Sequence, residues 1–222
     1  MPHSADWYRR WGKRVLDVGL AFPLLLLAFP VLVVVAALLA IQNRGPWLFR
    51  QLRPGLHGQL FTLYKLQTMT TQDAHGHLLP DAQRLPRLGR WIRATSLDEL
   101  PQLWNVLRGE LSLVGPRPLL PEYLPLYSQA QARRHLVLPG LTGWAQINGR
   151  NAISWEQKFL YDVWYVDHAS FGLDLRILLR TAVRVLGAHG ITAPGQATND
   201  RFRGSSSHST DLSASHDLPP FS

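Results

Sequence analysis

Asp98 and Glu99 are adjacent carboxylates, and of all the residues in this 222-residue chain they are the best suited to chemistry. Of two neighbouring carboxylates, one can bind Mg²⁺ while the other attacks a phosphorus atom. Arginines flank the pair in the sequence, and guanidinium groups bind diphosphates through paired hydrogen bonds. These arginines are Arg87, Arg90, Arg93, Arg108 and Arg117. The pattern indicates a site for a diphosphate substrate.

The same two carboxylates could instead only start a helix. Ser96 and Glu99 have the spacing of a capping box, and Asp98 would favour the positive end of the helix dipole. Pro101 weakens this interpretation, because proline is best tolerated in the first helical position, which places both carboxylates ahead of the helix. Prolines on both sides of Arg117 also restrict its backbone, as the positioning of a phosphate ligand requires. From the residues alone, both interpretations stay open.

Val18–Ile41 is a run of 24 residues without a charge, which is long enough to span a membrane as a helix. It is too long for the apolar region of a signal peptide, so we expect the mature protein to retain it. Basic residues lie on both sides of the run, which suits a segment whose two ends face the same side of a membrane. Pro30 lies near its middle and Pro23 nearer its start, and prolines bend helices. We predict a re-entrant helix-break-helix with its break at Pro30; the alternative is one kinked spanning helix.

The net charge of +8 comes from the N-terminal part of the chain. Residues 1–94 hold 12 Lys and Arg against 4 Asp and Glu, whereas residues 95–222 hold 11 of each kind. Basic groups beside an apolar segment are attracted to anionic lipid headgroups, so we expect an anionic phospholipid membrane as partner and no nucleic acid. The chain has no cysteine, which excludes disulfides, thiolate metal sites and cysteine nucleophiles.

The remaining periodicities predict an α+β fold that is mostly helical. Residues 47–53 and 59–69 are strand-like and are separated by turn-forming residues, which predicts a small β-sheet in a compact globular domain. Leucines in Leu97–Leu107 form a helical stripe that ends before Gly109, and Ser154 begins another helix with capping-box spacing.

Leu173–Leu186 predicts a basic amphipathic helix suited to a membrane surface, because Arg176, Arg180 and Arg184 recur every four residues between apolar ones. The alternative is an ordinary solvated helix face. Together these segments predict three parts: a membrane-anchoring segment at 1–43, a cytoplasmic catalytic domain at 44–203 and a disordered Ser-rich tail at 204–222.

Several long motifs resemble the bacterial sugar transferases known as monotopic phosphoglycosyl transferases. The resemblance runs from Lys13 to Leu186 and is carried by KRVLDVGLAF, FRQLRPG, LYKLQTM, TSLDELPQLWNVLRGELSLVGPRPLLPEYLPLYS, LPGLTGWAQINGRNAISWEQKF and YDVWYV. The chain is most similar to the minimal single-domain branch of that family. This branch includes enzymes that begin protein N-glycosylation with a di-N-acetylated bacillosamine phosphate.

The resemblance implies a reaction at the inner membrane of a bacterium, on its cytoplasmic face. A sugar-1-phosphate, carrying an N-acetylated amino or diamino sugar, would pass from a UDP-sugar to polyprenyl (undecaprenyl) phosphate with release of UMP. Asp98 matches the nucleophile that forms a covalent sugar-phosphate intermediate in a ping-pong scheme, and Glu99 matches its partner at Mg²⁺.

Other matching positions are implied to bind substrate or shape the anchor. Lys65, Arg93, Arg117, Arg150 and Asp162 match substrate-binding positions of the family, and Pro30 matches the proline that breaks the membrane helix. Gln67 departs from the family pattern, because many relatives have a basic residue there. A homodimer is a further possibility that the sequence leaves open.

Two other classes of function compete with this one. A non-catalytic membrane scaffold of a glycan-assembly complex would use Asp98 and Glu99 only as a helix cap. A glycosyltransferase that moves the sugar alone would release UDP. The released nucleotide separates the three: UMP, nothing or UDP.

Overall fold

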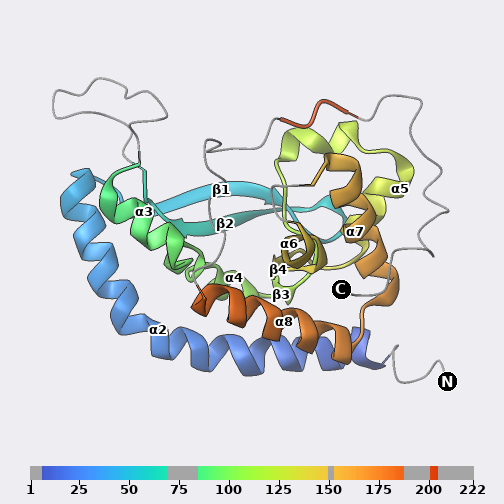
Figure 1. Ribbon diagram of the computed structural model, residues 1–222, viewed down its shortest axis with the longest axis horizontal. Helices are drawn as coiled ribbons and strands as arrows, with labels where there is room; N and C mark the ends of the chain where they lie inside the picture. The colour runs from blue at the N-terminus through green and yellow to red at the C-terminus, as the bar shows by residue number, and fades with distance from the viewer. Residues whose placement is uncertain (1–6, 70–84, 150–152, 188–200, 205–222) are drawn as a thin grey trace.

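The computed structural model of the protein describes residues 7–69, 85–149, 153–187 and 201–204. A long curved helix runs along one side of the molecule, and the remaining elements pack against its inner face (Figure 1). The strands are β1 (Leu48–Pro54), β2 (Leu60–Leu66), β3 (Ser112–Val114) and β4 (Gly140–Thr142). The longer helices are α2 (Lys13–Asn43), α3 (Arg87–Ala94), α4 (Gln102–Arg108), α7 (Trp155–His168) and α8 (Phe171–Leu186). Short helices complete the chain: η1 (Tyr8–Gly12), η2 (Leu56–Gly58), η4 (Leu97–Glu99), η5 (Pro121–Leu126), α5 (Gln129–Ala132), η6 (Arg133–Leu136) and α6 (Trp144–Asn148). The predicted mostly helical α+β class is confirmed.

The predicted small β-sheet is present, and a second small sheet accompanies it. β1 and β2 form the expected antiparallel hairpin, with Leu48 opposite Leu66 and Pro54 opposite Leu60. β3 and β4 form a second, parallel pair, in which Ser112 lies opposite Gly140. Each of these strands has only three residues, which is too short for a recognisable alternation of apolar and polar side chains.

Helix α2 is the apolar segment, and it is continuous through both of its prolines. Its ribbon bends about halfway along (Figure 1), and Pro23 and Pro30 lie in this middle part. The predicted break at Pro30 is therefore a bend within one helix and not an interruption. The stretch Tyr8–Asn43 is long and apolar enough to cross a membrane, and only 11% of its most apolar window is buried.

Both ends of α2 are bound to the same globular part of the chain. At its start, Lys13 forms an ion pair of 2.6 Å with the buried Asp174 of α8, and Arg14 donates to the backbone oxygens of Val106 and Leu107 at the end of α4. At its end, the Asn43 side chain donates to the Gln67 oxygen at 2.7 Å. The basic flank before the apolar run thus makes internal contacts, in addition to any it makes with lipid.

The main core lies where α4, β3, α6, α7 and α8 meet. Leu103, Leu111, Tyr165 and Ile177 are almost completely buried there. The predicted stripe over Leu97–Leu107 divides into two elements, because Pro101 separates the single turn η4 from α4. A glycine at φ 79°, Gly109, ends α4 as predicted.

Helix α8 has the amphipathic pattern that its sequence predicts. One face buries Asp174 and Ile177, while Phe171, Leu175, Leu179 and Val183 are exposed at intervals of four residues. The three arginines of the predicted stripe directly follow the last three of these apolar residues in the sequence. The exposed face therefore combines apolar and basic groups, as an interfacial helix requires.

Candidate active site

Asp98 and Glu99 lie in the single turn η4, between α3 and α4. The capping-box interpretation is wrong, because the Ser96 side chain makes no capping hydrogen bond and its backbone N–H donates to the Arg93 oxygen. Ser96 also has the left-handed conformation, with φ 58°. A non-glycine residue adopts this conformation only at some cost, which the surrounding contacts must offset. The carboxylates precede α4, as the position of Pro101 predicts.

The Glu99 carboxylate joins three separate segments of the chain. Its Oε1 accepts hydrogen bonds from Lys65 Nζ of β2 at 2.7 Å and from Arg117 Nη2 at 2.5 Å. Burial by itself would raise the pKa of Glu99, but the charges of Arg117 and Lys65 lower this pKa far below its usual value. Glu99 is therefore a fixed anion that orients two cations.

Asp98 is in the opposite situation. Its side chain is half-buried, and within the described ranges its carboxylate takes part in no hydrogen bond or ion pair. Burial and the neighbouring negative charge of Glu99 raise the pKa of Asp98, while Lys65, Arg93 and Arg117 partly offset this. An unbonded carboxylate close to three cations is free to form a new bond to an electrophile.

Arg93 is brought to the site by the packing of α3 against β2. Its Nε donates to the buried Thr68 Oγ1 at 2.9 Å, just beyond the end of β2. The helix can approach this closely because residue 89 is glycine: a Cβ there would lie 2.2 Å from the Thr68 backbone oxygen. Not every predicted arginine joins the site, because Arg108 pairs instead with Glu110 at 3.2 Å.

Two other predicted positions are placed differently. Asp162 is only 2% exposed, and its Oδ2 accepts from Arg134 Nη2 at 2.7 Å, so its carboxylate faces Arg134 and not an open site. Arg150 lies outside the described residues. Gln67, where a basic residue was expected, donates its side-chain amide to the Met69 oxygen at 2.9 Å and so holds the backbone after β2.

Arg134 is a residue that the sequence analysis missed, and it fixes the backbone at Arg117. Its Nη2 donates both to Asp162 and, at 2.7 Å, to the Arg117 backbone oxygen. Its guanidinium lies over the rings of Tyr127 and Phe159, with 5.7 and 5.6 Å to the two centroids. No local signal marks Arg134, because its ion-pair partner is 28 residues away.

These contacts leave room for a magnesium ion at Asp98 and Glu99. Within the part of the chain that the structure describes, no group of three or more histidine or acidic side chains could hold a metal. Mg²⁺ does not need such a group, because it commonly binds one or two carboxylates together with water and substrate phosphates. Within the described ranges, Asp98 makes no hydrogen bond or ion pair, and both contacts of Glu99 use Oε1. The two residues therefore fit a Mg²⁺ ion that is shared with a phosphate ligand.

The buried Asp162–Arg134 pair predicts a specific pattern of stabilities. Replacing Asp162→Leu leaves Arg134 buried without its counter-charge and should lower the free energy of unfolding by about 3–5 kcal/mol. The double change Asp162→Leu with Arg134→Met should recover most of this loss. Asp167→Leu is the control, because its pair with Arg133 is largely exposed and should contribute about 1 kcal/mol or less. Urea unfolding in detergent measures all three, and equal losses for Asp162→Leu and Asp167→Leu would contradict the assignment.

Comparison with known proteins shows the family to which this chain belongs. The sequence profile described as bacterial sugar transferase matches residues 8–188. The uncharacterized sugar transferase EpsL of Bacillus subtilis is 57% identical over 194 residues, which are 87% of this chain and 96% of that protein. A UDP-glucose:undecaprenyl-phosphate glucose-1-phosphate transferase of Caulobacter vibrioides is 42% identical, over 78% of this chain and 69% of that protein. A transferase of the same description from Xanthomonas campestris is 39% identical, and the match covers 82% of this chain but only 40% of that longer protein. The chain belongs to the bacterial sugar transferase family.

Proposed function

We propose that the protein is a phosphoglycosyl transferase, which moves a sugar-1-phosphate from a UDP-sugar to undecaprenyl phosphate or a similar polyprenyl phosphate and releases UMP. The observation that carries this proposal is the contrast between Asp98 and Glu99. Among the described residues, Glu99 is held by two cations, whereas Asp98 makes no hydrogen bond or ion pair beside them. The Caulobacter and Xanthomonas relatives are named for the transfer of glucose-1-phosphate from UDP-glucose to undecaprenyl phosphate. These names support a UDP-sugar and a polyprenyl phosphate as the substrates of this protein.

In the first step, an Asp98 oxygen attacks the β-phosphorus of the UDP-sugar. A bond forms between this oxygen and phosphorus, and the bond from phosphorus to the oxygen that bridges to the α-phosphate breaks. The bridging oxygen keeps the electron pair and leaves as part of UMP. A carboxylate is a weak nucleophile, so the reaction depends on neutralising the negative charge of both reactants. Among the described residues, Lys65, Arg93 and Arg117 lie near enough to Asp98 to neutralise this charge.

In the second step, a phosphate oxygen of the polyprenyl phosphate attacks the same phosphorus atom. The bond from phosphorus to the Asp98 oxygen breaks, the carboxylate is restored, and polyprenyl-diphosphate-sugar is released. Two displacements with one covalent intermediate constitute a ping-pong scheme. Glu99 remains an anion throughout and keeps Lys65 and Arg117 in position.

Asp98 and Glu99 would hold Mg²⁺, which when bound supplies positive charge to the diphosphate. The sugar that we infer from the family resemblance is an N-acetylated amino or diamino sugar. Relatives named for glucose and galactose transfer make these sugars the first alternatives to test.

An apolar pocket supports an isoprenoid acceptor. It has a volume of about 330 Å³ and lies between α2 and the elements around the β1–β2 hairpin, with Leu25, Phe29, Trp47, Tyr64 and Trp104 in its lining. The pocket also includes Pro101, two residues after Glu99. The pocket could therefore bind the apolar chain of a polyprenyl phosphate while its phosphate group reaches Asp98.

We propose a monotopic, re-entrant topology at the cytoplasmic face of the bacterial inner membrane. The support comes from α2, both of whose ends bind the same globular part of the chain. A straight spanning helix would put these ends on opposite sides of the bilayer, about 30 Å apart. A polyprenyl phosphate keeps its phosphate at the interface, where a bent anchor would hold the site.

The covalent role of Asp98 predicts the loss of UMP release in Asp98→Asn, because an amide is nearly isosteric with the carboxylate but is not a nucleophile. Glu99→Gln should also reduce turnover severely, since it removes the anion that holds Lys65 and Arg117. Asp167→Asn changes an exposed acid of α7 and is the control.

The assay contains UDP-N-acetylglucosamine, UDP-glucose and UDP-galactose in turn with undecaprenyl phosphate, and it quantifies UMP and UDP. Turnover of Asp98→Asn within about tenfold of the wild type would refute the covalent role, and release of UDP would favour simple glycosyl transfer.

The intermediate itself should be detectable without the acceptor. Wild-type protein incubated with the UDP-sugar alone should gain the mass of one sugar-phosphate, on a peptide that contains Asp98. Release of UMP without any such adduct would favour direct, single-step transfer.

The metal assignment predicts that EDTA stops UMP release and that added Mg²⁺ restores it, because the diphosphate would otherwise face two carboxylates without sufficient positive charge. Thermal unfolding in EDTA should be unchanged, since Glu99 already has Lys65 and Arg117 as partners. Full turnover in EDTA would contradict a magnesium requirement.

The topology predicts that Ser4→Cys and Glu156→Cys, each the only cysteine in its variant, are both protected in intact cells from a membrane-impermeant thiol reagent. Both should react after lysis. Labelling of one site alone in intact cells would establish a spanning helix. Pro30→Leu should favour a straighter α2 by about 3 kcal/mol of local preference. We expect mixed labelling and reduced turnover in this variant and not complete inversion, because Lys13 and Arg14 hold the start of α2 to the globular part.

A further inference from the structure

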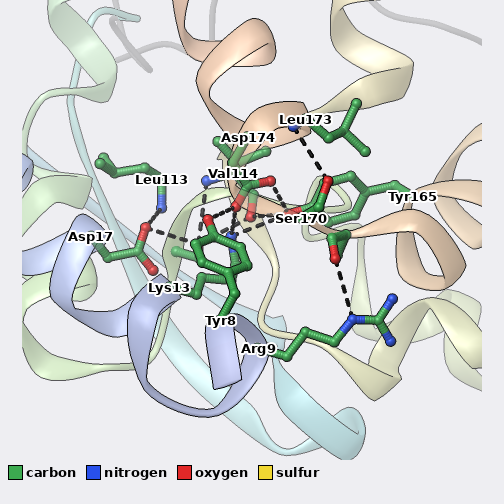
Figure 2. A network of polar contacts seen from close by, with 12 residues as sticks. Tyr8, Arg9, Lys13, Asp17, Leu113, Val114, Tyr165, Ser170, Leu173 and Asp174 are labelled. Atoms are coloured by element: carbon green, nitrogen blue, oxygen red, sulfur yellow. Dashed lines mark hydrogen bonds and ion pairs between the residues drawn. The ribbon is translucent and has the colours of Figure 1, made fainter. Parts of the chain in front are cut away.

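Asp17 is a carboxylate in the membrane-anchoring helix α2, and it faces the globular part of the protein and not lipid. Its side chain is 1% exposed. Its Oδ1 accepts from the Leu113 backbone N–H at 2.9 Å and from the Ser112 hydroxyl at 3.0 Å (Figure 2). Both partners belong to the short strand β3. Its Oδ2 is buried without a hydrogen-bond partner among the described residues, and burial raises the pKa of Asp17, so the two bonds to Oδ1 are the contacts that hold this carboxylate at β3.

The contact completes the hydrogen bonding of β3. One edge of this strand pairs with β4, and Leu113 N–H points away from that pairing. Asp17 takes the place of a neighbouring strand at the free edge, and the Tyr165 hydroxyl oxygen lies 3.2 Å from the Val114 oxygen. A strand of three residues with one partner has few bonds of its own, so these side chains determine where it lies.

The position of β3 determines that of Arg117, because the segment that joins them is short and restricted. Arg117 follows Val114 by three residues, through Gly115 and Pro116. Gly115 N–H donates to the Thr142 oxygen at 2.9 Å, and the Pro116 oxygen accepts from Gly140 N–H at 2.9 Å. A Cβ at Gly115 would lie 2.4 Å from the Leu138 oxygen, so the backbones of these two segments are in close contact. A displacement of β3 would therefore move the guanidinium that binds Glu99.

A second set of contacts holds the turn of α2 that carries Asp17. Lys13 lies one turn earlier and binds the buried Asp174 of α8, whose carboxylate also accepts from the Tyr8 and Tyr165 hydroxyls (Figure 2). Tyr165 is shared between this cluster and β3. The start of the anchor, α8 and β3 thus form one buried polar network.

We propose that Asp17 is a positioning residue for sugar-phosphate transfer: through β3 it sets the location of Arg117, so that the membrane anchor is part of the scaffold of the active site. This inference rests on the proposed function. It adds that the anchor cannot be exchanged for an unrelated membrane helix without loss of the first chemical step.

Three variants in lipid nanodiscs test the proposal. Asp17→Leu removes the acceptor for Leu113 N–H, whereas Asp17→Asn keeps an oxygen there. Arg9→Met is the matched control, because it removes contacts between the start of the same helix and the oxygens of Asp167 and Ala169, with none to β3. The measurements are the single-turnover rate of UMP release, the KM for undecaprenyl phosphate, and amide hydrogen exchange of residues 112–117.

We expect Asp17→Leu to slow UMP release at least tenfold and to speed exchange in 112–117, with the KM for the lipid unchanged. Asp17→Asn should stay within threefold of the wild type, and Arg9→Met should match the wild type in all three measurements. A wild-type rate in Asp17→Leu, an equal loss in Arg9→Met, or no recovery in Asp17→Asn would overturn the proposal.

If Asp17→Leu fails to fold, Asp17→Asn decides through its exchange in 112–117: protection like that of the wild type supports the role of the acceptor oxygen, and lost protection overturns it. If wild-type protein releases no UMP from any UDP-sugar, the proposed function fails. Amide exchange of residues 112–117 is then still informative about the further inference. Faster exchange in Asp17→Leu, but not in Asp17→Asn or Arg9→Met, would support a role of Asp17 in positioning β3 even without turnover.

Discussion

The interaction on which the site depends is the sharing of one Glu99 oxygen between Lys65 and Arg117. It joins the β1–β2 hairpin, the turn η4 and the segment after β3, which have no other common contact of this strength among the described residues. The three side chains are only partly buried, but breaking the arrangement would still leave charges of both signs without their partners. The same arrangement keeps Asp98 near three positive charges, while its own carboxylate makes no hydrogen bond or ion pair with the residues that the structure describes.

Arg117 shows how much structure is needed to hold one guanidinium in place. Prolines on both sides restrict its backbone, Arg134 binds its carbonyl oxygen, and Arg53 donates to the carbonyl oxygen of Pro118. Positioned donors contribute to phosphoryl transfer because they need no rearrangement when charge develops. In the proposed reaction, the contacts that surround Arg117 would therefore matter for catalysis as well as for the fold.

The anchor and the globular part are also less separate than their compositions indicate. Apolar side chains cover most of the outer surface of α2, yet Lys13, Arg14 and Asp17 turn inward to α8, α4 and β3. The division at residue 43 that composition predicts is thus a change in composition, and the two parts on either side of it are in direct contact. A helix with both ends fastened to one body can bend at its prolines while its ends stay together.

The sequence by itself determined the elements whose pattern is local. The apolar run, the hairpin with its Pro-Gly turn, the amphipathic α8 and the glycine that ends α4 are all visible over a few turns or strands, and the structure contains each of them. Adjacency in the sequence also made Asp98 and Glu99 a candidate pair. Only the tertiary structure decided which groups meet. Lys65 and Arg117 lie 34 and 18 residues from Glu99, and Arg134 lies 28 residues from Asp162. Several arginines flank the carboxylates, and the sequence alone does not distinguish those that reach the site from those that do not. Ser96 likewise has the spacing of a helix cap, but it does not form one. Ion pairs between residues so far apart in the sequence depend on how helices and strands pack. The local sequence pattern does not determine that packing.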